Sequence, residues 1–433
     1  MDRLPGFRDF YPEPLPQPDL WSADARHHIF ESWRNTSRSY GFREYDGPPL
    51  EPLELFTTKS GQEIIGQLYN FKDKGERDVS LRPEMTPTLA RMIAAHERSY
   101  KKPIKWFAIP QLFRYERQQK GRLREHFQLN ADIIGEASVV ADAELLALAI
   151  DVMRAVGLTS SDVRARVSDR QLLTAILSEV GVKNAEMPAV FAAIDKVGRE
   201  PRDVTLGKVD KAVSSAEARR GVARILDHAN DLNALAADFR NSPDVMEGVT
   251  HMREYLNFLD ALGVGDWVDF DLSIVRGLAY YTGKVFELFD ANGEFRAICG
   301  GGRYDDLLSS IGGVNLPALG FGMGDVVLTE LLRSRNLLPT PEFGTEYWVA
   351  ADDDSMLPEV MTVASRLRAK SRSVEYALKS QTLARQLKTA SAAGVQRVVL
   401  LRRDDYTKGK VTVKTLADGS EQSLALDAFL NSL

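Results

Sequence analysis

The sequence predicts an α+β fold, in which an antiparallel sheet is flanked by helices, interrupted by a helical insertion and followed by a small C-terminal α/β domain. Three patterns carry this prediction. Residues 105–134 resemble a long β-hairpin, residues 170–250 are helical, charged and rich in alanine, and strand and helix patterns alternate after residue 344. At 433 residues the chain exceeds what one hydrophobic core usually organises, so two or three domains are expected.

The N-terminal region predicts a helix, a short strand and a second helix. Apolar residues recur at helical spacing between residues 19 and 40, and Gly41 follows as a stop. Residues 42–45 are typical of a short strand. Thr86-Pro87 then opens a helix with proline in its first turn, and as structure alone Thr86 is its expected cap.

The hairpin at residues 105–134 carries most of the polar chemistry of the N-terminal half. Its second strand alternates strictly between apolar residues and the polar Gln128, Asn130 and Asp132, so these three side chains line one face of the sheet. In isolation such a face is more simply interpreted as solvent-exposed, because antiparallel sheets often leave one side open. The basic loop at 117–122 changes this balance, since arginine forks suit phosphate oxygens and could hold a triphosphate against the sheet.

Three further charged residues are expected near that polar face. Arg114 and Glu116 share one face of the first hairpin strand. Glu84 lies just before the helix that begins near Thr86, where a carboxylate is favourable beside the helix dipole. The same carboxylate could also bind the ammonium group of an amino acid, and the two interpretations are compatible.

The middle of the chain predicts helices without recognisable site chemistry. Residues 138–157 form an amphipathic helix that ends at Gly157. The stretch from about 170 to 250 is interpreted as an inserted helical module. Strand signals return at residues 268–275 and 279–289.

The last third of the chain predicts a hairpin and then a separate domain. Asn292-Gly293 is a strong type I′ turn signal before a strand at residues 295–299. Residues 337–344 contain two prolines and are interpreted as a linker. The alternation beyond them predicts a small domain with a largely parallel sheet.

The most specific segment of the chain is Arg276-Gly277-Leu278-Ala279-Tyr280-Tyr281-Thr282-Gly283. Taken alone, its two tyrosines would be ordinary strand aromatics that face opposite ways. Two glycine clusters follow, at 300–302 and 320–324. Neither has the spacing or the early βαβ context of a dinucleotide fingerprint, so a Rossmann site is excluded. Glycines on strands more plausibly let a planar ligand approach the backbone.

Composition excludes several classes of protein. A net charge of −6 argues against a general nucleic-acid coat, although residues 344–433 hold 13 Lys and Arg against 11 Asp and Glu, which permits local RNA contact. The single cysteine, Cys299, excludes an internal disulfide framework, and the six histidines do not suggest a structural metal site. No apolar run approaches the ~20 residues of a membrane span, and the N-terminus lacks a signal-like core, so a cytoplasmic protein without a membrane partner is expected.

Together these segments resemble histidyl-tRNA synthetases over essentially the whole chain. Five ordered stretches carry the resemblance: residues 276–281 and 301–305 are similar to the family's two histidine signatures, 113–135 to class II motif 2, 40–48 to the dimer-forming motif 1, and 320–328 to motif 3. The resemblance implies ATP-dependent ligation of L-histidine to tRNA(His) through a histidyl-adenylate. It also implies Mg²⁺ as cofactor and a homodimer.

The resemblance implies a class II synthetase architecture with a six- or seven-stranded antiparallel catalytic sheet. The catalytic core is expected at 1–169 and 251–336, an insertion that embraces the tRNA acceptor stem at 170–250, and an anticodon-binding domain at 344–433.

The resemblance also implies the role of each site residue. The expected histidine-binding residues are Glu84 and Thr86 at the α-amino end, Gln128 nearby, and Asp132 and Tyr281 facing the imidazole with Tyr280 alongside. The expected ATP-binding residues are Arg114, Glu116, His126, Arg276 and Gly322. Arg114 and Arg276 are the expected catalytic residues, Arg114 at the α-phosphate and Arg276 where other class II enzymes place a magnesium ion. No protein side chain is implied as a metal ligand, because Mg²⁺ would bridge the outer phosphates of ATP.

The sequence departs from the family's pattern at a few positions and leaves two alternatives open. Val327 stands where an arginine is usual, His126 where a phenylalanine is common, and Asp132 where a glutamate is usual. One alternative is a catalytically silent paralogue that binds histidine as a regulatory subunit of ATP phosphoribosyltransferase. Such paralogues lack the C-terminal domain and tend to lose the signature around Arg276. The other is a class II synthetase for proline, threonine or glycine, against which the tyrosine pair after Leu278 argues.

Overall fold

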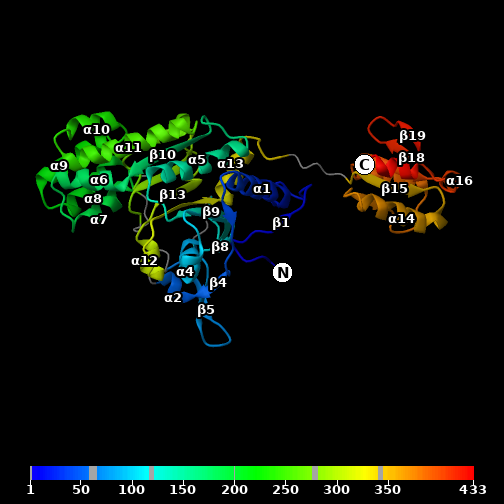
Figure 1. The fold of residues 1–433 in the computed structure, drawn as a ribbon, viewed down its shortest axis with the longest axis horizontal. Coiled ribbons are helices and arrows are strands. Elements are labelled where there is room, and N and C mark those ends of the chain that lie inside the picture. Colours follow the sequence, from blue (N-terminus) through cyan, green and yellow to red (C-terminus); the bar gives the residue numbers. More distant parts are fainter. Residues whose placement is uncertain (1, 58–65, 117–120, 199, 276–280, 340–344) are drawn as a thin grey trace. The chain divides into compact units, whose positions relative to one another are not determined.

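The computed structural model describes residues 2–57, 66–116, 121–198, 200–275, 281–339 and 345–433. The chain divides into two compact units, Met1–Pro339 and Thr340–Leu433 (Figure 1). Of the predicted features, Arg276, Tyr280 and part of the basic hairpin loop lie outside the described residues.

In the described part of the first unit, nine strands form the central sheet. Their order is β11 (Val268–Phe270), β10 (Val163–Asp169), β12 (Lys284–Asp290), β13 (Cys299–Arg303), β14 (Ala318–Gly324), β9 (Glu125–Ile134), β7 (Ile104–Ala108) and β3 (Arg43–Glu44), with β8 (Gln111–Phe113) also paired to β9. Neighbours from β10 to β7 are antiparallel, as predicted. The sheet is wider than the six or seven strands expected, because β11 and β3 add parallel edges.

The predicted hairpin is confirmed, with one interruption. Both β7 and β8 pair antiparallel with the long strand β9. Between them the chain passes through Ile109-Pro110, where proline supplies no N–H for the ladder. The Pro110 carbonyl instead accepts from the Gln128 amide at 3.1 Å.

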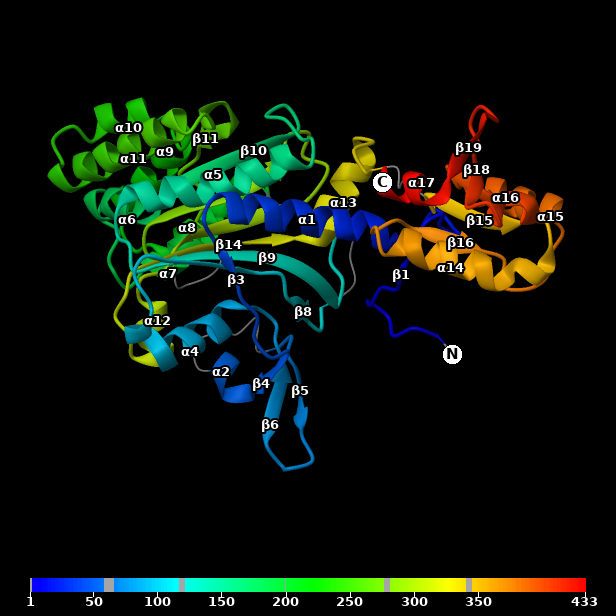
Figure 2. The same ribbon diagram turned by 45° about the vertical axis from the view of Figure 1, so that its right-hand side comes forward.

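Helices α1 (Ala23–Ser39), α5 (Val139–Ala155) and α13 (Asp325–Ser334) cover one face of this sheet (Figure 2). The apolar residues Leu129, Ala131 and Ile133 of β9 belong to the core beneath them. Helix α1 begins where the Ser22 hydroxyl accepts from the Ala25 amide at 3.0 Å, and Gly41 follows its end with φ 78°. The predicted period-two alternation therefore leaves the polar residues of β9 on the opposite face.

On that opposite side, α4 (Thr86–His96) packs against α12 (Leu307–Gly312). A small sheet of β4 (Leu50–Pro52), β6 (Asp78–Leu81) and β5 (Tyr69–Lys72) lies beside α2 (Leu53–Thr57). The expectation that Thr86 caps α4 was wrong. Met85 is the cap residue and is already in the α region, so the helix starts one residue earlier and Thr86 is its first residue.

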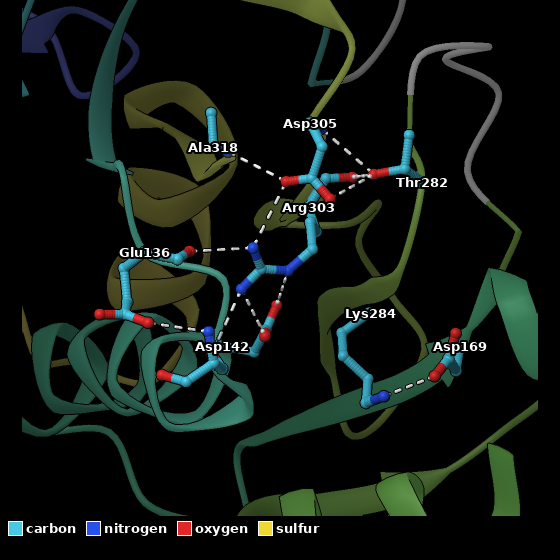
Figure 3. Close-up of polar contacts among 9 residues, drawn as sticks. Glu136, Asp142, Asp169, Thr282, Lys284, Arg303, Asp305 and Ala318 are labelled. Carbon is cyan, nitrogen blue, oxygen red and sulfur yellow. Dashed lines mark hydrogen bonds and ion pairs between the residues drawn. The ribbon is translucent and has the colours of Figure 1, made fainter. Parts of the chain in front are cut away.

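The region predicted to be helical contains α6 (Arg170–Glu179), α7 (Met187–Ile194), α8 (Arg202–Ala212), α9 (Ala216–Asp227), α10 (Leu232–Asp238) and α11 (Pro243–Ala261). The last of these continues beyond residue 250. The region joins the sheet through Asp169, which ends β10, accepts from the Gln171 amide at 2.8 Å as the cap of α6, and pairs with the buried Lys284 of β12 (Figure 3).

The connection between the two strands of the second predicted hairpin is longer than expected, because β12 ends at Asp290 and β13 begins at Cys299. Strands β12 and β13 pair, but the predicted type I′ turn was wrong, because Gly293 has a positive φ of 71° whereas Asn292, the other central residue, does not have a positive φ. The second strand starts at Cys299 rather than at residue 295, although the Ile298 amide already donates to the Leu288 carbonyl at 2.8 Å.

In the second unit, the described strands are β15 (Tyr347–Ala351), β16 (Val374–Tyr376), β17 (Arg397–Leu401), β18 (Lys410–Thr415) and β19 (Glu421–Ala425), and the α-helices are α14 (Leu357–Arg368), α15 (Leu383–Ala392), α16 (Arg403–Tyr406) and α17 (Leu426–Asn431). The first three strands are parallel, as predicted. The last two pair antiparallel, so the expectation of a largely parallel sheet holds for only half of it. The connections before β18 and β19 are shorter than the dozen or more residues that a parallel crossover needs, which favours antiparallel pairing.

None of the helices in the described ranges is both long enough and apolar enough to cross a membrane.

Candidate active site

The polar face of β9 lies against two glycine-rich strands. Gly300 and Gly302 of β13 stand opposite Gly322 and Gly320 of β14, so the four glycines share one face. A Cβ built on Gly320 would lie 2.1 Å from Oδ1 of Asp132. Glycine is therefore needed at this position to leave room for the Asp132 side chain of the neighbouring strand.

Above these glycines is a cavity of about 240 Å³, which we call the Asp132 cavity. Its lining includes five of the six residues expected to bind histidine: Glu84, Thr86, Gln128, Asp132 and Tyr281. The sixth, Tyr280, lies outside the described residues. Asn130, Tyr304 and Phe321 complete the lining with Arg114 and three of the glycines. The residues expected to bind histidine thus come from separate segments of the sequence and line one cavity.

Asp132 lies deep in this cavity. Its side chain is buried, with the residue 4% exposed, and burial raises its pKa from 3.8 to about 7. The Tyr304 hydroxyl donates a hydrogen bond to its Oδ1 and so favours the ionised form. Asp132 is therefore poised between the charged and neutral states near neutral pH, where it can accept from an N–H group of a polar ring.

Glu84, Thr86 and Arg114 also line the Asp132 cavity. Glu84 is buried. The Arg114 Nε donates to the Pro83 carbonyl at 2.9 Å, which fixes the guanidinium beside the loop that carries Glu84. The cavity thus contains an anion at one wall and a cation next to it, an arrangement suited to a zwitterionic amino acid.

A second cavity of about 300 Å³, the His126 cavity, adjoins the first. Four residues line both cavities: Arg114, Gln128, Gly300 and Gly322. All the described residues that were expected to bind ATP line the His126 cavity, namely Arg114, Glu116, His126 and Gly322. Val326 and Val327 of α13 form another part of its wall. Arg114 therefore stands where the two cavities meet.

His126 is held in its neutral form. Burial, the nearby charge of Arg114 and the more distant charge of Arg8 together lower its pKa from 6.5 to about 3. Its ring therefore acts as a flat, uncharged surface of the cavity at physiological pH. In the same cavity, the Arg122 guanidinium pairs with the Glu116 carboxylate at 2.8 Å.

A polar network joins residues that are next in sequence to both tyrosines of the Asp132 cavity, and Figure 3 shows its side chains around Arg303 and Asp305. Arg303, at the end of β13, donates to Asp142 of α5 at 2.7 Å and to the Glu136 carbonyl at 3.0 Å. Asp305 accepts from the Ala318 amide at 3.0 Å and contacts the Thr282 hydroxyl. Because Tyr304 lies between Arg303 and Asp305, and Tyr281 precedes Thr282, this network positions both phenols.

Sequence reasoning missed two lining residues and one buried cluster. Tyr304 follows the glycines of the second signature, and Asn130 stood in the alternation, so both left a signal. The cluster joins Arg8 to Glu125 and Asp325, and no local pattern announces it. Arg276 cannot be placed beside Arg114, because it lies outside the described residues.

No group of three or more His, Cys, Asp or Glu side chains suited to a metal ion occurs within the described ranges. Glu116 is the carboxylate that lines the His126 cavity. A divalent cation there would meet one protein carboxylate and would depend on a bound ligand for its remaining oxygen ligands.

Comparison with known proteins gives a consistent picture. The family model of histidyl-tRNA synthetases matches residues 16–325, and that of the anticodon-binding domain matches residues 346–433. The chain is 40% identical to a histidine–tRNA ligase of Opitutus terrae, over 96% of this chain and 94% of that protein. It is also 38% identical to a histidine–tRNA ligase of Halobacterium salinarum, over 99% of this chain and 96% of that one.

Solved structures agree on the fold. A histidyl-tRNA synthetase from Nostoc superposes with a TM-score of 0.78 at 23% identity, covering 98% of this chain and all of that one. The apo histidyl-tRNA synthetase of S. aureus gives a TM-score of 0.74 at 22% identity, covering 100% of this chain and 99% of that one. The predicted fold class is therefore confirmed.

Proposed function

Because the chain belongs to the histidyl-tRNA synthetase family, we propose that its two adjoining cavities are the amino-acid and ATP sites of a histidine–tRNA ligase. The family membership shows the activity, which is the charging of tRNA with histidine. The observation that supports this assignment is that the two cavities share part of their lining. Arg114 lines both the cavity that contains Asp132 and the cavity that contains His126.

In the Asp132 cavity, histidine is proposed to lie with its imidazole toward Asp132 and Tyr281. An ionised Asp132 would accept from an imidazole N–H, and the glycines of β13 and β14 would let the flat ring approach the sheet. The α-ammonium group would meet Glu84, with Thr86 and Gln128 nearby. A side chain without a matching N–H would leave the buried Asp132 without the hydrogen bond that the imidazole supplies, which disfavours other amino acids by about 10⁴ or more.

Adenylate formation requires the histidine carboxylate to attack the α-phosphorus of ATP, which forms the acyl–phosphate bond, breaks the bond to the bridging oxygen of the β-phosphate and releases pyrophosphate. With ATP in the His126 cavity, that phosphorus would lie at the shared wall, where Arg114 can stabilise the charge that develops on the phosphate oxygens. Because Arg114 is already fixed by the Pro83 carbonyl, it needs little reorganisation. No protein nucleophile is needed, since positioning and electrostatics supply the catalysis. His126 would offer its neutral ring to the adenine.

Magnesium is proposed to act through ATP rather than through a protein cage. Mg²⁺ supplies charge neutralisation at the outer phosphates when it is bound. Glu116 is the cavity carboxylate that could approach it, and its pairing with Arg122 would have to adjust.

Arg276 is proposed to stand at the α-phosphate opposite Arg114, on the resemblance of its signature. We predict that Arg276→Ala abolishes adenylate formation while leaving histidine binding largely intact. Pyrophosphate exchange and calorimetry with histidine measure the two effects separately. Near-normal exchange by this variant would remove the role assigned to Arg276.

The remaining assignments concern assembly. Residues 170–250 are proposed to contact the acceptor stem of tRNA(His) and residues 344–433 its anticodon, with catalytic segments at 1–169 and 251–336. A homodimer is also proposed, because residues 40–48 resemble the motif that pairs class II subunits, and two-fold assembly is the commonest closed oligomer. A concentration-independent monomer in sedimentation would contradict it.

ATP–pyrophosphate exchange measured with each of the standard amino acids tests the proposed site as a whole. Exchange with histidine alone is expected. The absence of exchange would favour the regulatory paralogue, and exchange with proline, threonine or glycine would favour another synthetase.

A further inference from the structure

Arg8 lies in a buried cluster with two carboxylates that come from distant parts of the chain. Its Nε donates to Glu125 Oε1 at 2.7 Å, and its Nη1 donates to Asp325 Oδ2 at 2.9 Å. The side chains of Arg8, Glu125 and Asp325 are 1%, 1% and 3% exposed. At this depth water cannot replace a lost partner, so the arrangement is held by the guanidinium fork.

The two carboxylates begin the two elements that they belong to. Glu125 is the first residue of β9, and Asp325 is the first residue of α13. Asp325 Oδ1 also accepts from the Phe127 backbone N–H at 2.9 Å, and Glu125 accepts from the Gln111 side chain at 3.0 Å. The cluster therefore fixes the start of the helix against the start of the strand.

The residues next to these carboxylates line the His126 cavity. His126 follows Glu125 in β9, and Val326 and Val327 follow Asp325 in the first turn of α13. The cluster therefore ties these two walls of the cavity together, in addition to the ladder that pairs Gly324 with Gln128. Arg8 itself is not among the lining residues.

A second arginine, Arg26, lies near the cluster but contacts aromatic rings rather than the two carboxylates. Arg26 stacks over the rings of Phe10 and Phe127, at 4.3 and 5.6 Å from guanidinium carbon to ring centre. Its buried Nε has no hydrogen-bond partner among the described residues. Arg8 is thus the cation that bonds to both carboxylates in the described part of the chain.

We propose that Arg8 is a positioning residue for ATP, which holds the first turn of α13 at the distance from β9 that the nucleotide requires. The inference rests on the proposed function of the His126 cavity as the ATP site. It assigns to the N-terminal segment a part in the affinity for ATP, although the segment does not touch the nucleotide.

The opposite end of α13 offers a matched control. Arg335, its C-terminal cap residue, bonds to Asp290 at 2.8 Å and to Asp162 at 3.3 Å. This arginine also joins carboxylates, with Glu294 as a third at 3.8 Å, and at 18% its side chain is more exposed than that of Arg8, but none of these residues lines either cavity. Loss of Arg335 should therefore test what an arginine–dicarboxylate cluster contributes to stability alone.

The experiment compares Arg8→Gln with Arg335→Gln in histidine-dependent ATP–pyrophosphate exchange. We expect Arg8→Gln to raise the KM for ATP by about 10- to 100-fold, as displacement of a positioned group does, with the KM for histidine within about twofold. Arg335→Gln should change neither KM. A purely structural role would lower the maximal rate of both variants and leave both KM values unchanged.

Asp325→Asn provides a second test should Arg8→Gln fail to fold. Asparagine keeps an acceptor oxygen for the Phe127 N–H but removes the charge that Arg8 binds, so the KM for ATP should again rise while that for histidine stays. An unchanged KM for ATP in the folded variants would overturn the inference. Failure of the proposed function would appear differently, as a parent protein without histidine-dependent exchange.

Discussion

Replacing Asp132 by asparagine should stabilise the unliganded protein above neutral pH and at the same time remove its affinity for histidine. Burial raises the pKa of this carboxyl from 3.8 to about 7. Between these values the folded state retains a proton that the unfolded state has released. The free energy of unfolding therefore falls as the pH rises through this window, and the full cost is present above about pH 7.

The size of the effect follows from the same shift. At 1.36 kcal/mol for each pKa unit, a rise from 3.8 to about 7 corresponds to roughly 4 kcal/mol at pH 8. Asparagine has nearly the same shape and no charge to bury. Its side-chain oxygen can still accept from the Tyr304 hydroxyl, so little else should change.

The assay is urea unfolding of the parent and Asp132→Asn proteins at several pH values from 5 to 8. Comparing the two proteins cancels the titration of all other groups. The stability advantage of the variant should widen by about 2 to 3 kcal/mol across this range. Calorimetry should show histidine affinity reduced by at least about 100-fold at pH 8. A pH-independent difference, or a variant less stable at pH 8, would refute the reasoning, because Asp132 would then be ionised at no cost.

Three further substitutions test the site. Arg114→Gln should slow pyrophosphate exchange by about 10²- to 10³-fold, and an unchanged rate would show that Arg114 does not face the reacting phosphate. Gly322→Ala would place a methyl group 2.7 Å from the Gln128 amide, so the KM for histidine should rise by about tenfold or more, whereas Gly207→Ala, whose methyl group meets nothing within 4 Å, should be kinetically neutral. Equal kinetics for the two alanine variants would contradict the packing argument. Because the pKa of His126 is lowered to about 3, the KM for ATP should show no titration of this ring between about pH 5.5 and 8, and His126→Phe should stay within about threefold of the parent. A step near pH 6.5 that disappears in the variant would show that the ring is protonated there.

Much of the site could be predicted from the sequence because strand geometry is periodic. Strict alternation in β9 placed Gln128 and Asp132 on one face, and the structure has both in the same cavity. The glycine pairs at 300 and 322 were interpreted as sites of close approach, and they lie at the boundary of the two cavities. These features are local, so a single segment of sequence is enough to reveal them.

Features that depend on distant partners could not be predicted. Arg8 is 117 residues from Glu125 and 317 from Asp325, and nothing near Arg8 in sequence indicates that it will be buried. Tyr304 was part of a recognised motif, but its bond to Asp132 becomes visible only when β9 and β13 flank the same strand, β14. Both the burial of Arg8 and the hydrogen bond between Tyr304 and Asp132 are determined by tertiary packing rather than by local propensity.

The most direct test of the account is a crystal structure with histidine and a non-hydrolysable ATP analogue bound together. The account predicts the imidazole within hydrogen-bond distance of Asp132 and Tyr281, and the α-phosphate at the wall shared by the two cavities, in contact with Arg114 and Arg276. An imidazole bound outside the Asp132 cavity, or an α-phosphate that neither arginine contacts, would contradict it.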